Sequence, residues 1–189
     1  MENLTFAPLS NTSVLSSFLC GVDEMDYYIH HALQMSIDAR YCKAYSVSYK
    51  GEIVAFFALN YDCLELDVQA AYDLLHKEKE AIDIKLEYEE IFKEKQYYPA
   101  MEISFLAVKD EYQGLDVGTR IIDAIFQMVK DRAIAGCQFV TVMAYDKPSY
   151  SAVDFYKKMG FTRIGESSYD TVRMYKPIYT LSDDYFFID

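Results

Sequence analysis

Residues 102–123, EISFLAVKDEYQGLDVGTRIID, contain the pattern on which the fold assignment depends. Residues 101–108 are a strongly β-prone run, and apolar residues recur at helical spacing over 117–135. A strand therefore leads through a glycine-containing loop directly into a helix. Such a loop points several backbone N–H groups at one spot, with the positive end of the helix dipole behind them. The pattern predicts a phosphate-binding site.

The loop itself narrows the choice of ligand. Its residues are Gln113, Gly114, Leu115, Asp116, Val117, Gly118 and Thr119. It lacks the Lys-Ser/Thr pair of a nucleoside triphosphate loop, so the sequence gives no support for hydrolysis of ATP or GTP. Taken alone, the loop is a weak signal, and a plain turn between a strand and a helix explains it better than a phosphate site does.

The flanking sequence predicts a mostly antiparallel sheet. Upstream we expect a strand at 4–9, a helix at 22–40, and a hairpin of strands at 44–49 and 52–61. Downstream we expect a strand at 138–144, a helix at 149–159, and strands at 161–165 and 171–176. This order predicts an α/β (α+β) fold with one mixed, mostly antiparallel central sheet flanked by helices.

Residues at about 66–97 differ in composition from the rest of the chain. They are rich in helix-forming residues, lack glycine, and contain 9 Asp or Glu against 5 Lys between Leu66 and Gln96. We expect one or two helices inserted between strands of a single domain that spans residues 1–189. The insertion fits either a packed surface helix or a lid over a substrate site.

Charge and hydropathy limit the protein's location and partners. The formal net charge is -12, which disfavours nucleic acid as a partner unless basic side chains gather on one face. No apolar run is long enough to span a bilayer, and the N-terminus lacks the features of a signal peptide. We therefore expect a cytoplasmic protein with no membrane contact.

Cysteine and histidine give no sign of a metal site. The cysteines, which we expect to be reduced and mostly buried, have no CxxC spacing: Cys20, Cys42, Cys63 and Cys137. The histidines lack partners at metal-ligand spacing and are expected on helix surfaces: His30, His31 and His76. The sequence thus predicts neither a bound metal nor a disulfide framework.

A second motif places the loop in a family context. Residues 151–161, SAVDFYKKMGF, follow the loop by some 30 residues. Together the two stretches resemble the GCN5-related N-acetyltransferase (GNAT) family, in which the loop reads Gln/Arg-x-x-Gly-x-Gly/Ala and a later stretch reads A-x-x-F-Y-x-K-x-G-F. Gln113 and Gly118 match the first motif, and the second is matched by Ala152, Phe155, Tyr156, Lys158, Gly160 and Phe161.

The resemblance implies an acetyl-CoA N-acyltransferase fold with acetyl-CoA as the acetyl donor. The loop amides would hold the CoA pyrophosphate, and Leu106, Ala107 and Val108 would bind the thioester carbonyl and pantetheine by strand-like hydrogen bonds. Two positions depart from the family pattern. Asp116 stands where a glycine is usual, so its carboxylate would oppose the pyrophosphate, and Ser149 replaces a frequent asparagine.

Acetyl transfer to an amine needs a base for the amine and an acid for the departing thiolate. By resemblance, Tyr156 is the candidate acid; the alternative is plain packing in a chain with 18 tyrosines. Glu102 is the candidate base, and strict alternation would place it on the same face as Leu106 and Val108. Its alternative is a salt-bridged or edge-exposed glutamate.

The acceptor remains open at this level. We expect a primary amine of a small molecule or protein to attack acetyl-CoA directly in a ternary complex. Residues 18–29, FLCGVDEMDYYI, resemble the start of a GNAT branch of toxins that acetylate aminoacyl-tRNA, so a toxin of this kind is an alternative. A further alternative is a non-catalytic module that binds acetyl-CoA. The sequence leaves a homodimer and an antitoxin partner open.

Overall fold

The central sheet has eight strands in the order β1-β2-β3-β4-β5-β8-β7, with β6 paired to β5. The computed structural model describes residues 3–66, 97–132 and 135–178. Within these residues, every neighbouring pair of strands is antiparallel except β4 and β5, which are parallel. The predicted fold class is therefore confirmed.

The strands lie close to the predicted positions, except that β3 and β4 are longer than expected and β6 was not predicted. Their bounds are β1 Thr5–Leu9, β2 Lys43–Tyr49, β3 Glu52–Glu65, β4 Tyr97–Val108, β5 Phe139–Lys147, β6 Tyr150–Ser151, β7 Thr162–Ser168 and β8 Thr171–Pro177. β3 and β4 extend further than expected because they pair with each other as far as Glu65 and Tyr97. The predicted helical insertion lies between these two ends, outside the described residues apart from its first and last positions.

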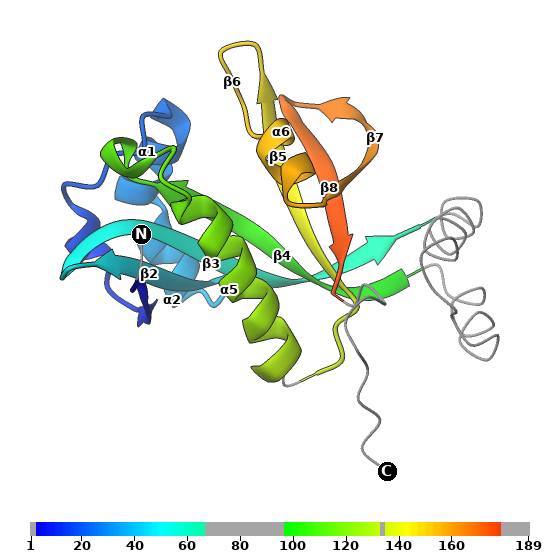
Figure 1. Ribbon diagram of the computed structural model, residues 1–189, viewed down its shortest axis with the longest axis horizontal. Coiled ribbons are helices and arrows are strands. Elements are labelled where there is room, and N and C mark those ends of the chain that lie inside the picture. The colour runs from blue at the N-terminus through cyan, green and yellow to red at the C-terminus, as the bar shows by residue number, and fades with distance from the viewer. Residues whose placement is uncertain (1–2, 67–96, 133–134, 179–189) are drawn as a thin grey trace.

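Helices cover both faces of the sheet. Their bounds are η1 Thr12–Leu15, α1 Asp23–His31, α2 Leu33–Asp38, η2 Asp110–Tyr112, α5 Val117–Arg132 and α6 Val153–Lys158. α5 lies over one face of the sheet at β3 and β4, and α1 and α2 lie on the other face (Figure 1). The burial pattern agrees: Ile121 and Ile125 of α5 share a core cluster with Phe57, whereas Ile29 of α1 packs with Phe56.

The predicted helix at 22–40 is two helices. The chain breaks at Ala32, whose φ of -124° is not helical. The Ser36 hydroxyl donates to the Ala32 carbonyl at 3.2 Å, a bond that commonly bends a helix. Val22 occupies the N-cap position of the first helix, and Asp23 is its first helical residue.

The predicted helix at 149–159 is also shorter. Its first residues form β6, and the helix proper is Val153–Lys158. The hydroxyl of Ser151 accepts from the Val153 N–H at 3.3 Å, so a polar residue of the short strand supports the start of the helix.

The cysteine prediction holds in part. All four cysteines are free, but Cys63 is exposed and Cys137 is only partly buried. His30 and His31 lie exposed on α1 as expected, while His76 is outside the described residues. Among the described residues no group of side chains could hold a metal ion, and no described helix has the length and hydropathy needed to cross a membrane.

Candidate active site

β4 and β5 pair along only part of their length. Their register runs from Ala100 opposite Phe139 to Ile103 opposite Val142. Beyond this point the two strands diverge, β4 toward α1 and β5 toward β6 (Figure 1). Between Ile103 and Val108, the edge of β4 that faces away from β3 therefore has no strand partner in the described part of the chain.

The hydrogen bond of Lys109 shows which residues of this open edge direct their backbone N–H and C=O groups away from β3. The Lys109 N–H donates to the Val54 carbonyl at 2.8 Å, which makes this a hydrogen-bonded pair. In an antiparallel ladder such pairs alternate, so Ala107 also points its backbone groups at β3. Leu106 and Val108 then point theirs into the gap between β4 and β5. These two positions can bind an extended ligand as a strand would.

A bulge in β4 changes the predicted side-chain alternation. Phe105 pairs with Ala58 and Ile103 with Leu59, so Ser104 is an extra residue. Consequently Ile103, Leu106 and Val108 pack together on the α5 face. The prediction that Glu102 shares a face with Leu106 and Val108 is therefore wrong. Glu102 lies on the opposite face of the sheet.

Glu102 is held by a neighbour on β3. Asn60 lies directly opposite it and donates from Nδ2 to Glu102 Oε2 at 3.0 Å. The Asn60 Oδ1 atom is buried and has no partner. Glu102 itself is half-buried. Among the described residues no cation pairs with it.

Beside Glu102 lies a polar cluster that sequence reasoning missed. Asp62 of β3 reaches across the small Ala100 of β4 and accepts from the Thr141 hydroxyl of β5. Arg173 of β8 donates to the same Asp62 carboxylate at 2.7 Å and to the Cys63 carbonyl at 2.8 Å. The cluster joins the two halves of the sheet where β4 and β5 meet. Strand order alone carries no signal for such a contact.

Tyr156 lies on α6, on the opposite face from Glu102. It belongs to the core cluster of the α5 face, where its ring contacts Phe155 and Phe161. Burial, and to a lesser extent Tyr150, raises the pKa of Tyr156 well above the ordinary value of a tyrosine. Its hydroxyl therefore stays protonated at neutral pH. The protonated hydroxyl is the form that a proton donor needs.

The predicted phosphate loop has the expected backbone. Gly114 and Asp116 both have positive φ, 72° and 61°, so Asp116 adopts the left-handed conformation that a glycine would favour. The Asp116 carbonyl accepts the first helical bond of α5, from Arg120, at 3.1 Å. The N–H groups of Val117, Gly118 and Thr119 lie in the first turn of α5, where a helix leaves its donors unpaired.

The N-terminal segment is fastened to this loop. Gln113 donates from Nε2 to the Cys20 carbonyl at 2.7 Å, and the Asp110 N–H donates to the Leu19 carbonyl at 3.1 Å. Asp26 in turn accepts from the backbone of Cys20 at 2.8 Å. The segment that carries the second sequence resemblance therefore lies at the end of β4. Burial, with a smaller effect of Asp26, raises the pKa of Cys20 to about 12, so this thiol is a poor acyl carrier.

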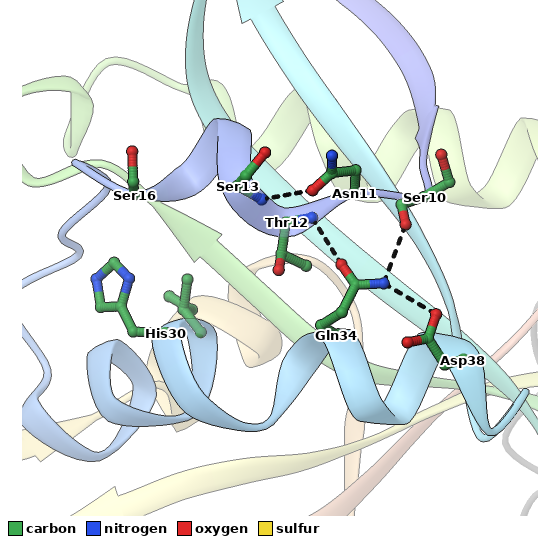
Figure 2. Close-up of a pocket in the computed structure, with 9 residues that line it drawn as sticks. Ser10, Asn11, Thr12, Ser13, Ser16, His30, Gln34 and Asp38 are labelled. Atoms are coloured by element: carbon green, nitrogen blue, oxygen red, sulfur yellow. Dashed lines mark hydrogen bonds between the residues drawn. The ribbon is translucent and has the colours of Figure 1, made fainter.

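An open depression of about 610 Å³ lies elsewhere, between η1 and the helices α1 and α2 (Figure 2). It is lined by hydroxyl and amide side chains, but these already bond one another. Gln34 accepts from the Thr12 N–H at 2.9 Å and donates to the Ser10 carbonyl and Asp38. Neither Glu102 nor Tyr156 lines it. The depression is not part of the candidate active site.

Comparison with known proteins identifies the domain. The family model described as the acetyltransferase (GNAT) domain matches residues 74–163. The chain carries a GNAT acetyltransferase domain. The family resemblance and the enzyme class inferred from the two sequence motifs are thus confirmed. A comparison with curated protein sequences gave no match.

Solved structures similar to the GNAT domain include toxins of this class. AtaT complexed with acetyl-methionyl-tRNAfMet is 18% identical, with a TM-score of 0.67 over 93% of this chain and 95% of that one. AtaTR bound with AcCoA is 17% identical, with a TM-score of 0.65 over 94% and 95%. The KacTA–DNA complex is 16% identical, with a TM-score of 0.63 over 93% and 94%. These likenesses show that the chain has the GNAT fold.

Proposed function

We propose that this protein transfers the acetyl group of acetyl-CoA to the amino group of an aminoacyl-tRNA by direct attack. The observation that carries acetyl transfer is the open edge of β4, flanked by Glu102 on one face and by Tyr156 on the other. An acid and a base on opposite faces can act on the two sides of a thioester that lies in the gap.

The open edge and the loop fit the two ends of the donor. Leu106 and Val108 offer backbone groups to the pantetheine arm, and Ala107 lies between them. The loop from Gln113 to Asp116 and the first N–H groups of α5 fit the pyrophosphate, because a helix N-terminus favours anions. The match to AtaTR bound with AcCoA supports this assignment of the donor.

Each chemical step then has a residue. Glu102, directly or through a water molecule, accepts a proton from the acceptor amine, whose lone pair attacks the thioester carbon. A backbone N–H of Leu106 or Val108 donates to the carbonyl oxygen as it gains charge. The new C–N bond forms while the C–S bond breaks, and the Tyr156 hydroxyl gives its proton to the CoA thiolate. Afterwards Glu102 releases its proton to bulk water and Tyr156 takes up a proton from it, so both residues return to their starting forms.

The choice of acceptor rests on the comparisons. The sequence alone favoured a primary amine of a small molecule or protein over aminoacyl-tRNA. The match to AtaT with acetyl-methionyl-tRNAfMet spans nearly the whole chain, and it favours the alternative. The resemblance of residues 18–29 to the same toxin branch agrees with this choice.

The experiment incubates the full chain with acetyl-CoA and a panel of aminoacylated tRNAs, followed by mass spectrometry of the released aminoacyl group. We expect N-acetylation of one or a few members, lost by at least roughly 10²-fold in Tyr156→Phe and in Glu102→Gln. No acetylation of any aminoacyl-tRNA, with acetyl-CoA bound, would refute the proposed acceptor.

A small-molecule or protein amine is the second candidate. The net charge of -12 and the carboxylate of Glu102 favour a cationic acceptor. A panel of polyamines, aminoglycosides and peptide amines, assayed by thiol release from acetyl-CoA, tests it in parallel. If the protein binds acetyl-CoA but none of these acceptors causes thiol release, the result would support the non-catalytic alternative.

A further inference from the structure

An ion pair bridges the open end of the gap between β4 and β5. Lys147, the last residue of β5, contacts Glu24 of α1 with an Nζ–Oε1 distance of 2.6 Å, although 123 positions separate them in the sequence. The N-terminal end of α1 is held at the end of β4 through Leu19 and Cys20. The pair therefore joins the two halves of the sheet where the strands have diverged, on the face opposite α5.

The cation of this pair is held firmly and its partner is not. The Lys147 side chain is 21% exposed, and its Nζ atom lies 5.5 Å from the centre of the Tyr145 ring. Tyr145 packs against the core cluster that contains Ile29 of α1. The Glu24 side chain is 58% exposed. The hydrogen bond to Glu24, with a smaller contribution from the charge of Asp170, raises the pKa of Lys147, which therefore stays protonated.

This arrangement allows one carboxylate to be exchanged for another anion. An exposed ion pair adds little stability, so a group that brings more charge can displace Glu24. By comparison, Lys109 at the end of β4 contacts both Glu52 and Glu111 and is less available. Lys147 lies on β5 six positions beyond Thr141, the residue that pairs with Glu102, so alternation places it on the same face of the sheet as Glu102.

We infer that Lys147 binds a phosphate group of the acceptor in exchange for Glu24, and thereby selects acceptors that carry a phosphate close to the amine. The inference rests on the proposed function, since it names how an aminoacyl-tRNA end would be recognised. It also gives a strongly acidic chain a local cation for a polyanion, because a phosphate and an ammonium form a strong charge-assisted hydrogen bond.

The test measures binding of a defined probe by the full chain. The probe is a 5′-labelled CCA trinucleotide with methionine joined to its 3′ end through a stable amide. We expect Lys147→Met to raise its Kd roughly three- to tenfold and to reduce the slope of log Kd against log salt by about 0.7, the value for one phosphate contact on a single strand. Glu24→Gln should lower the Kd without reducing that slope.

Lys43→Met is the matched control. Lys43 also lies over a tyrosine ring, 5.6 Å above Tyr45, but it starts β2 and Tyr45 packs on the α5 face. Lys43→Met removes the same charge as Lys147→Met, at a position away from the gap between β4 and β5. The inference is overturned if Lys147→Met weakens binding no more than Lys43→Met, if Glu24→Gln weakens it as much as Lys147→Met, or if the unmodified chain does not bind the probe. Binding needs no acetyl transfer, so the acetylation assay can fail separately.

Discussion

The Cα atom of Gly118 on α5 lies against the ring of Phe155 on α6. A Cβ atom at Gly118 would lie 3.1 Å from Phe155 Cζ and 3.3 Å from Cε2, closer than side chains normally approach. The family motif glycine of the loop and a residue of the second motif are thus in direct contact. The glycine is needed for helix packing whether or not phosphate approaches it.

Gly118→Val should lower the free energy of unfolding by about 1 to 3 kcal/mol, because it overpacks the contact between α5 and α6. Urea denaturation checks this. Phe155→Leu in the same chain should restore part of the loss by making room. A Val variant as stable as the parent, or no recovery in the double variant, would contradict the contact.

Tyr156→Phe should reduce kcat by roughly 10² to 10⁴ while the affinity for acetyl-CoA stays the same. The raised pKa of Tyr156 means that its proton is present at neutral pH and is lost only well above the ordinary tyrosine range, so kcat should not fall through ionisation of Tyr156 between pH 7 and about 10. Thermal unfolding is the control. Loss of kcat together with loss of stability would return Tyr156 to a packing role.

Asp62→Leu should destabilise the protein by about 1 to 3 kcal/mol, because it leaves Arg173 and Thr141 without their shared carboxylate. The double variant Asp62→Leu with Arg173→Met should recover part of this loss, as measured by urea denaturation. Glu166→Gln, which removes the exposed partner of Arg163, is the control and should have no measurable effect. An Asp62 variant that behaves like this control would show that the cluster adds no stability.

Most of the sheet could be predicted from the sequence because its elements depend on local patterns. Alternating apolar residues, the turn at Lys50 and Gly51, and the helical spacing after Val117 each involve neighbouring residues. The bulge at Ser104 could not be predicted this way. It depends on how β4 pairs with β3, more than 40 positions earlier in the chain, and it decides which face Glu102 occupies.

The same reason explains the missed contacts at the site. Asp62 and Arg173 are 111 positions apart, and Glu24 and Lys147 are 123 apart. Each pair meets only because the strands and α1 come together in the fold. The motifs therefore point to residues within short stretches of sequence, and they missed the residues that join distant strands.

The cysteines should differ sharply in reactivity with a thiol reagent at pH 8. Cys63 is exposed and should react fast. Burial raises the pKa of Cys20 to about 12 and also raises that of Cys42, so both should be almost wholly protonated and slow. Raising the pH should speed Cys20 only as the value approaches 12. Mass spectrometry after brief labelling checks which thiol is modified first, and Cys63→Ser should remove the fast phase.

The last prediction concerns Asp116, because substitutions can test the effect of its charge separately from the effect of its backbone conformation. Its φ of 61° suits glycine or asparagine, and no side-chain hydrogen bond holds its carboxylate among the described residues. In the free protein the carboxylate is favoured by the dipole of α5, but it opposes a pyrophosphate at the same N–H groups. Its removal should therefore favour the donor.

Asp116→Asn keeps a residue that tolerates this backbone and removes only the charge. We expect Asp116→Asn and Asp116→Gly each to tighten acetyl-CoA binding by roughly three- to tenfold at low salt, as measured by calorimetry. The gain should shrink as salt is raised, because Asp116 is exposed and exposed charges are screened. Asp123→Asn removes a charge further along α5 and should change binding much less. If only the glycine variant binds more tightly, backbone freedom is the cause. If both bind more weakly, the carboxylate supports the loop, and its charge does not limit affinity for the donor.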